Sequence, residues 1–185
     1  MFAKEMLKQS LPLLVLCGLG GIVAGSTLGV MTGILENIPG LIVVIPAIIA
    51  MRGNISTAFG SRLGSAYHLG IIDADNIWNE ELKQNILGSI ILSFIVSILV
   101  GVLSYITTLL FFDITPNPVK LILIVILAGG LSALILTQLT ITIIYLVFKK
   151  GYDPDNITGP ALATFVDIVT MICIFASAIL VEGIL

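Results

Sequence analysis

The sequence has 185 residues, of which 58% are hydrophobic and 10% are charged, and its formal net charge is −3 at neutral pH. A soluble domain carries about 25% charged residues, so this chain lacks the polar groups to cover its own surface in water. The composition therefore predicts an all-α integral membrane protein in contact with the lipid bilayer, and it excludes a sizeable soluble domain. No basic block indicates a nucleic-acid partner.

Five apolar stretches are long enough to be transmembrane helices, since a span needs roughly 20 apolar residues. The predicted spans, in chain order, are 11–33, 39–60, 85–112, 119–148 and 157–181. The first is longer than the apolar region of a signal peptide, so we expect it to be retained. The whole chain, 1–185, is then one transmembrane domain of a multi-pass protein of the cell membrane.

Glycines are frequent in the first span, where Gly21 and Gly25 form a GxxxG pattern. Small residues at this spacing allow two helices to approach closely. The pattern therefore predicts tight packing of the first span against another helix.

The second span is less regular, because its purely apolar part ends at Met51. Two interpretations are open: the helix ends there and a loop follows, or the helix continues. If it continues, small and polar residues share one face at helical spacing and could line a pore. These residues are Pro46, Ala50, Gly53, Asn54, Thr57 and Ser61.

The fifth span contains a single carboxylate, Asp167. A charge in hydrocarbon costs from about 3 to more than 10 kcal/mol, so such a residue normally faces a partner, a cavity or an ion. The alternative is an aspartate near a helix end that reaches interfacial water. Because the sequence stays apolar beyond Asp167 as far as Leu180, we favour a functional carboxylate.

Other oxygen-bearing residues share the face of Asp167 at helical spacing. They include the Asn156 amide, the Thr164 hydroxyl and backbone carbonyls near Pro160. Hard oxygen ligands suit Mg²⁺, Mn²⁺ or Ca²⁺ better than copper or zinc. One carboxylate is a poor complete cage, but a two-fold axis beside Asp167 would supply a second.

The distribution of basic residues predicts the orientation of the chain. With five spans, all but one fall on the same side, and Lys120 alone falls on the other. The residues on the favoured side are Lys4, Lys8, Arg52, Arg62, Lys83, Lys149 and Lys150. The positive-inside rule then places the N-terminus in the cytoplasm and the C-terminus outside.

The sequence does not favour an enzyme. An intramembrane hydrolase needs a Ser–His pair, paired aspartates or a metal-binding cluster on facing helices. Here His68 is the only histidine, it lies away from the spans, and Asp167 is the only carboxylate in the middle of a span. A proton-coupled secondary transporter of a small solute, built from half-size subunits with Asp167 as the proton site, is the alternative to a cation pathway.

Two motifs resemble signatures of the MgtE and solute-carrier-41 superfamily of divalent cation transporters. Residues 46–54 (PAIIAMRGN) with 61–66 (SRLGSA) and Gly70 resemble its second-helix signature. Residues 153–156 (DPDN), Pro160 and 167–170 (DIVT) resemble its final-helix signature. The details of both motifs are closer to the solute-carrier-41 branch, and the resemblance covers essentially the whole chain.

The resemblance implies a pathway for divalent cations, chiefly Mg²⁺ with Mn²⁺ as another candidate, between two five-helix units. It implies that the second and fifth helices line this pathway and that Asp167 is the central cation-binding residue. By the same resemblance the metal-site residues are Asp167, Asn54, Thr164, Gly53, Asn156 and Pro46. Because the cytosolic regulatory region of MgtE proteins has no counterpart in this sequence and only one unit is present, we expect a homodimer or a pair with another half-unit.

Overall fold

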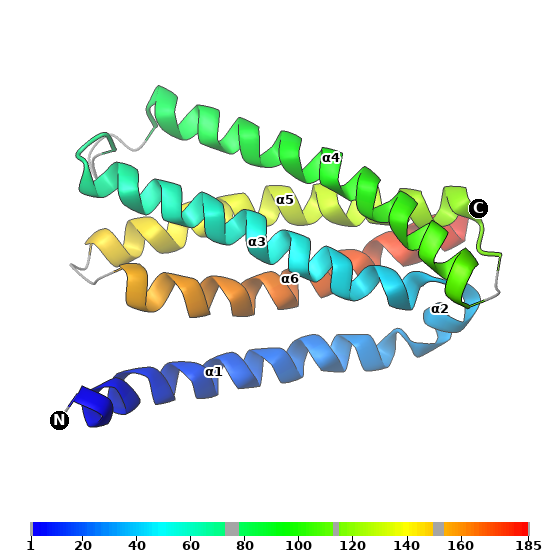
Figure 1. The fold of residues 1–185 in the computed structure, drawn as a ribbon, viewed down its shortest axis with the longest axis horizontal. Helices are drawn as coiled ribbons and strands as arrows, with labels where there is room; N and C mark the ends of the chain where they lie inside the picture. Colours follow the sequence, from blue (N-terminus) through cyan, green and yellow to red (C-terminus); the bar gives the residue numbers. More distant parts are fainter. Residues whose placement is uncertain (1, 73–77, 113–114, 150–153, 185) are drawn as a thin grey trace.

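The computed structural model describes residues 2–72, 78–112, 115–149 and 154–184, with backbone alone for residues 2–10, 13, 154–158 and 160. Within these ranges every regular element is a helix, which confirms the all-α prediction. The helices are α1 (Phe2–Val30), α2 (Thr32–Asn37), α3 (Leu41–His68), α4 (Glu80–Phe111), α5 (Pro118–Lys149) and α6 (Pro154–Ile184). The long helices run along the long axis of the molecule, and α2 is a short turn of helix at one end (Figure 1).

Among the described residues, four helices are long and apolar enough to cross a membrane: α3, α4, α5 and the part Ala161–Ile184 of α6. The apolar part of α1, Leu14–Val30, is shorter. The chain is thus a multi-pass membrane protein with four long apolar helices and a shorter fifth.

The helix α3 answers the question left open for the second span, because it continues through Gly53 and Asn54 to His68. Pro46 lies inside it and leaves the carbonyl of Ile42 without its helical donor. The other ends also differ from the predicted spans, since α1 already ends at Val30 and α6 already begins at Pro154.

A tight turn separates α2 from α3 and requires glycine. Gly40 has a φ of 89°, a left-handed conformation that costs glycine little. A Cβ on Gly40 would also stand 3.2 Å from the Cγ2 atom of Thr108 on α4. At the same end, the amide of Asn37 donates a 2.7 Å hydrogen bond to Glu182 and ties α2 to the end of α6.

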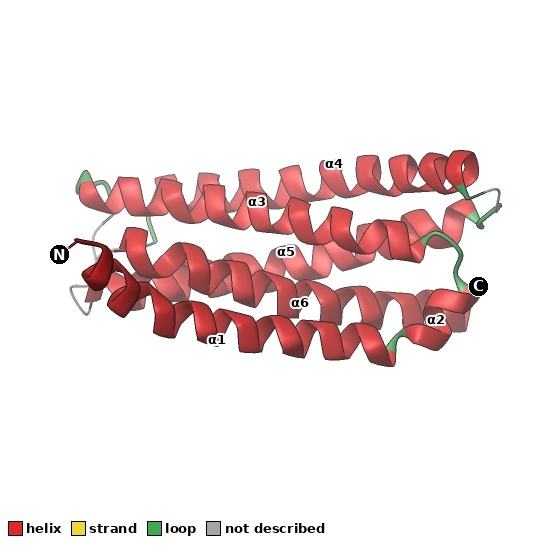
Figure 2. Cartoon of the chain, turned by 60° about the horizontal axis from the view of Figure 1, so that its bottom comes forward, coloured by secondary structure: helices red, strands yellow, loops and turns green. Residues whose placement is uncertain are grey.

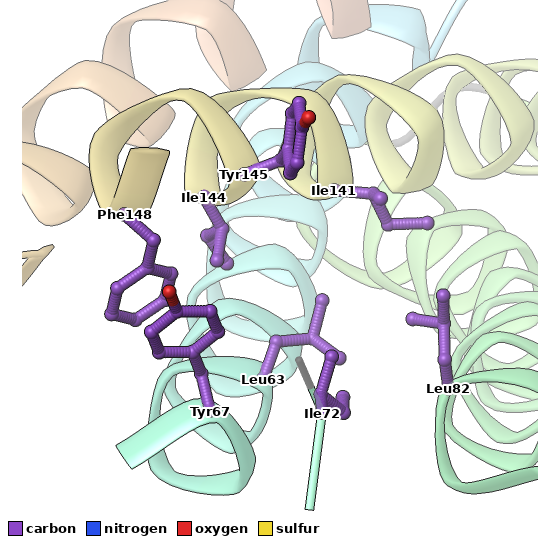
Figure 3. Close-up of a pocket in the computed structure, with 8 residues that line it drawn as sticks. All are labelled: Leu63, Tyr67, Ile72, Leu82, Ile141, Ile144, Tyr145 and Phe148. Carbon is purple, nitrogen blue, oxygen red and sulfur yellow. The ribbon is translucent and has the colours of Figure 1, made fainter. Parts of the chain in front are cut away.

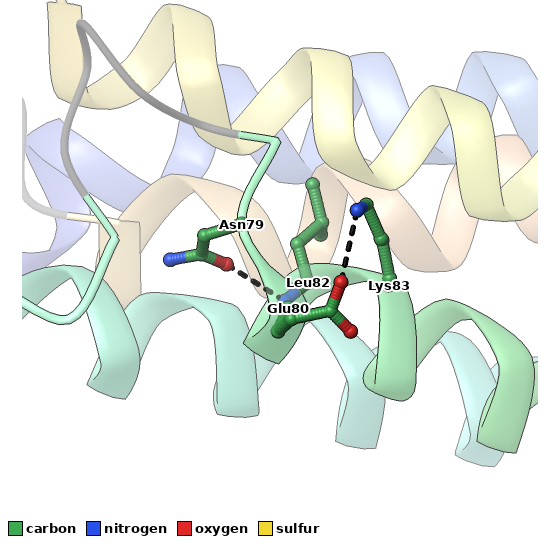
Figure 4. A network of polar contacts seen from close by, with 4 residues as sticks. All are labelled: Asn79, Glu80, Leu82 and Lys83. Atoms are coloured by element: carbon green, nitrogen blue, oxygen red, sulfur yellow. Dashed lines mark hydrogen bonds and ion pairs between the residues drawn. The ribbon is translucent and has the colours of Figure 1, made fainter.

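The start of α4 is fixed by a side-chain cap (Figure 4). The Oδ1 atom of Asn79 accepts a 2.9 Å hydrogen bond from the backbone N–H of Leu82, as an N-cap residue does. One turn of helix brings Lys83 within 2.9 Å of Glu80 at the surface. Asn79 also donates to the carbonyl of Ile71, so the cap holds the end of the α3–α4 connection in place.

The helix α6 packs inside the bundle, as α3 and α5 also do. It packs against α1, α3 and α5, while α4 packs against α3 and α5 (Figures 1 and 2). The helix α1 joins the bundle chiefly through α6. Residues on α6 therefore lie where three neighbours meet.

The buried face of α4 is polar and its exposed face is apolar. Hydroxyl residues four or seven positions apart point into the bundle, and two of them, Ser93 and Ser97, donate 2.6 Å hydrogen bonds to carbonyls of their own helix. The buried hydroxyl residues of α4 are Ser89, Ser93, Ser97, Ser104 and Thr108. Small residues at helix contacts and large apolar ones toward lipid are the arrangement expected in a membrane.

The closest helix approaches occur at glycines outside the GxxxG pattern. A Cβ on Gly20 would collide with Thr164, and one on Gly129 would collide with Ser97. Positions 21 and 25 have no described atom within 4 Å of an added Cβ. The prediction that Gly21 and Gly25 mediate tight packing is therefore wrong within this chain. The helix α1 packs against α6 through the face that contains Gly20 instead.

The two ends of the described chain lie at opposite ends of the bundle (Figure 1). Arg62, Lys83 and Lys149 are at or near the helix ends that share the N-terminal side, and Lys120 begins α5 at the other end. Arg52 does not belong to either group. It is in the middle of α3 and only 1% exposed, so counting it among the interfacial cations was wrong.

We predict that Gly20→Val lowers the melting temperature of the purified protein, while Gly18→Val leaves it unchanged. The added side chain at position 20 must displace Thr164, and overpacking of this kind typically costs 1–3 kcal/mol. Position 18 is exposed and has no described neighbour within 4 Å of its Cβ. Thermal unfolding in detergent measures both variants, and equal melting temperatures would contradict the α1–α6 contact.

Candidate cation site

Asp167 lies on α6 and is half-buried. Within the described part of the chain its carboxylate accepts no hydrogen bond and forms no ion pair; the one ion pair there joins Lys83 and Glu80. Both oxygens of this carboxylate are therefore available to accept hydrogen bonds or to bind a cation. Such a group is expected to meet an ion, a proton or a partner molecule.

The face of α3 that we predicted to line a pore points out of the bundle. The opposite face carries the core residues, among them Ile48, Ile55 and Phe59, which are at most 6% exposed. Gly53 on the predicted face is half-buried. The exposed members of this face are Pro46, Ala50, Asn54, Thr57 and Ser61.

Asn54 on α3 and Asp167 on α6 lie at nearly the same depth. The two helices run in opposite directions (Figure 1), and Gly60 meets Leu162, whose Cδ1 atom is 3.0 Å from an added Cβ. Five residues further along α6 is Asp167, and five residues back along α3 is Ile55. Because both helices rise 1.5 Å per residue, the Asp167 carboxylate belongs to the level of Asn54 and its neighbours.

The remaining predicted site residues are placed less completely. Thr164 is half-buried one turn before Asp167, in contact with Gly20 of α1. Asn156 and Pro160 belong to the first turns of α6, and their side chains lie outside the described residues. Pro46 is on the exposed face of α3. It lies near the start of α3, at the end of the bundle opposite the first turns of α6.

Asn54, Thr57 and Ser61 offer oxygen atoms that no described residue uses. Their side chains make no hydrogen bond within the described chain, so amide and hydroxyl groups are available on the outward face of α3. Asn54 lies at the level of the Asp167 carboxylate, and Thr57 and Ser61 continue the same line of hard oxygen donors along α3 by about one and two turns. Such donors suit Mg²⁺, Mn²⁺ or Ca²⁺.

Among the described residues, no group of three or more His, Cys, Asp or Glu side chains could hold a metal ion. A single copy therefore supplies one carboxylate and several neutral oxygens. This donor set fits an ion that keeps much of its water, as Mg²⁺ does, because Mg²⁺ dehydrates reluctantly and is often held by one or two carboxylates.

A separate apolar pocket near one end of the bundle does not belong to this site (Figure 3). It encloses about 30 Å³ between α3, α4 and α5, and the ring of Tyr67 stacks on Phe148 at its edge with 3.7 Å between centroids. His68, the last residue of α3, meets the same Phe148 edge-on. Its lining residues are aliphatic and aromatic, with the Tyr67 and Tyr145 hydroxyls as their polar groups and no carboxylate, so the pocket lacks the ligand set that a divalent cation needs.

Arg52 is a further functional candidate, whose direction in α3 the sequence did not determine. It lies one residue before Gly53, yet its side chain points into the bundle, where its Nη1 atom donates a 2.5 Å hydrogen bond to Ser93. Its Nε atom is buried without a partner. The spacing of the serines on α4 could have indicated this inward orientation of Arg52. It predicts a polar inner face on α4 that can accept hydrogen bonds from a guanidinium group.

The fold and the site together define a class of protein. Apolar helices with a half-buried carboxylate and uncommitted oxygen donors at one depth are typical of membrane transport proteins for ions. The family model for MgtE, described as a divalent cation transporter, matches residues 45–177. The chain belongs to this family.

Curated relatives match a larger share of the chain than the family model does. Solute carrier family 41 member 2 of Mus musculus is 25% identical over 175 residues, which is 90% of this chain and 30% of that protein. Member 2 of Gallus gallus is 24% identical with the same coverage. Member 3 of Rattus norvegicus is 25% identical over 85% of this chain and 35% of its own length. The chain thus spans about a third of the length of these relatives.

We predict that a cysteine at position 54 reacts with a membrane-impermeant thiol reagent and that Mg²⁺ slows the reaction. Asn54 is on the outward polar face, so a wet path would expose it to water-soluble reagents. The control is Leu99→Cys, since Leu99 is 54% exposed on the apolar face of α4 and would face lipid. Both are made in a background with Cys17 and Cys173 changed to alanine, and equal labelling of both positions would contradict a wet α3 face.

Proposed function

We propose that the protein moves divalent cations, with Mg²⁺ favoured, along a path between two copies of this chain, lined by α3 and α6. The observation that carries the proposal is the placement of Asp167 and Asn54. Both belong to the same depth of the bundle, both are at least partly open to the outside of a single copy, and neither is used by the described chain.

A second copy would remove the cost of exposing the polar groups of a single copy to lipid. Alone in a bilayer, the polar face of α3 and the Asp167 carboxylate would meet lipid, at a cost of about 3 kcal/mol or more for the charge. If two copies place these faces against each other, the faces enclose water instead. The two-fold axis also brings a second Asp167, which gives the pair of carboxylates that a hydrated Mg²⁺ suits.

Each predicted residue then has a role in the path. The paired Asp167 carboxylates hold the ion through its water shell near the middle of the membrane. The Asn54 amide, the backbone near Gly53 and the Thr164 hydroxyl contact those waters. Asn156 lies toward the path's end at the start of α6, and Pro46 frees the Ile42 carbonyl on the α3 side.

The mechanism is permeation or exchange, without covalent chemistry. Two carboxylates in a low-dielectric setting attract a divalent ion more strongly than a monovalent ion, since the interaction scales with the ion's charge. Binding through water keeps the ion from being held too tightly, because flux needs a site that the ion can leave as readily as it enters.

The orientation we propose has the N-terminus in the cytoplasm and the C-terminus outside. Arg62, Lys83 and Lys149 support it, since they are at or near helix ends on the N-terminal side of the bundle. The correction for Arg52 leaves this distribution one-sided, with Lys120 alone at the other end.

The test is Mg²⁺ uptake into proteoliposomes by the wild type, Asp167→Ala and Asp167→Asn. Because the carboxylate charge holds the ion, we expect both variants to lose uptake by at least tenfold, the asparagine keeping the shape without the charge. The matched control is Glu80→Ala, which removes an exposed carboxylate at the end of α4 and should leave uptake unchanged.

Two results would contradict this assignment. Wild-type uptake by Asp167→Ala would make the carboxylate structural. Flux that follows an imposed pH gradient, with no dependence on Mg²⁺, would support the proton-coupled transporter of a small solute in its place.

A further inference from the structure

Arg52 is a charged side chain that the cation path does not explain. It is 1% exposed in the middle of a membrane-spanning helix, and it is among the largest fully buried side chains of the described chain. Charged residues in such positions are rare and usually pair with an opposite charge. Here the described residues place no carboxylate against the guanidinium, and its Nε atom has no partner.

The contact that Arg52 does make is neutral. Its Nη1 atom donates to the Oγ atom of Ser93 on α4, and that hydroxyl donates to the carbonyl of Ser89. A serine hydroxyl stabilises the guanidinium position but does not cancel its charge. The helix α3 therefore has a fixed positive charge on its inner face and the predicted path residues on its outer face.

We propose that the charge of Arg52 sets how tightly the path holds its cation, by raising the electrostatic potential on the outer face of α3 where Asn54 lies. This inference rests on the proposed cation path. Arg52 is two residues from Asn54 along α3, and the diameter of one helix, about 10–12 Å, separates the two faces. Little water or salt lies between them to screen the charge, because the intervening atoms are helix backbone and buried side chains.

The role of such a charge is to oppose the carboxylates. Without an opposing positive charge, two Asp167 groups would bind a divalent ion more tightly and release it more slowly, even through its water shell. Two Arg52 groups behind the path walls reduce this attraction, so the ion leaves on the timescale that flux requires. Arg52 changes the affinity for the ion through its electrostatic field and is not a ligand of the ion, because it does not touch it.

An electrostatic role has a signature that a packing role lacks. A change in potential shifts the binding free energy in proportion to the ion's charge, so the fold-change in affinity for Na⁺ is the square root of that for Mg²⁺. Even at the dielectric constant of water, about 80, removing the two Arg52 charges, each about a helix diameter from the path, tightens Mg²⁺ binding by about tenfold or more and Na⁺ binding by about threefold or more. A distorted site would not follow this relation.

The experiment measures Mg²⁺ affinity by calorimetry, and Na⁺ affinity by competition, on the full chain in nanodiscs. Arg52→Gln removes the charge. Ser93→Asp keeps Arg52 and neutralises it in place with a carboxylate, which also gives the guanidinium an ionic partner and guards against a variant that fails to fold. Arg52→Lys keeps the charge, and Ser93→Ala keeps the charge while removing the hydrogen bond.

We expect Arg52→Gln and Ser93→Asp to bind Mg²⁺ about tenfold more tightly than the wild type, with the square-root shift for Na⁺ and slower maximal flux. Arg52→Lys and Ser93→Ala should keep wild-type affinities for both ions. Unchanged Mg²⁺ affinity in Ser93→Asp, or equal shifts for Mg²⁺ and Na⁺, would overturn the inference. If instead the wild type neither binds nor transports Mg²⁺, the proposed function itself has failed, and that result is seen without any variant.

Discussion

A carboxylate that lies half-open on the surface of an apolar helix bundle is the constraint on which the rest of this structure depends. Asp167 has no partner within the described chain, and lipid is a costly neighbour for its charge. Its helix, α6, packs against α1, α3 and α5, so the backbone around the charge is held from several sides. In the proposed path, the outward polar face of α3 at the same depth is the second wall of the site.

The residues at the helix contacts that support α3 and α6 are small or polar. This is expected in a membrane, where the hydrophobic effect does not drive helices together. Gly20 lets α1 approach α6 at Thr164, and Gly129 lets α5 approach α4 at Ser97. The serines of α4 receive Arg52 from α3. The same helix α3 thus presents a buried cation to its neighbours and uncommitted oxygens to the outside, and the proposed path uses both.

The sequence was sufficient to predict the helical membrane class and the small and polar face of α3 that contains Asn54, whereas the role of Asp167 stays a prediction. These follow from hydropathy, the cost of a buried charge and helical spacing. It could not show that Arg52 points inward, because an arginine next to a Gly-Asn pair fits the interface equally well. It also misassigned the packing glycines: Gly20, Gly21 and Gly25 are equivalent in composition, and only the rotation of α1 against α6 distinguishes them.

The central claim is that two copies share one site, and mixing subunits tests it most directly. Wild-type chains and Asp167→Lys chains are combined in known ratios, their assembly into mixed dimers is verified by differential tagging, and Mg²⁺ uptake is measured in proteoliposomes. One lysine in a shared path repels the ion, so uptake should fall as the square of the wild-type fraction. Uptake that falls in simple proportion to that fraction would show that each chain works alone, and would contradict the account.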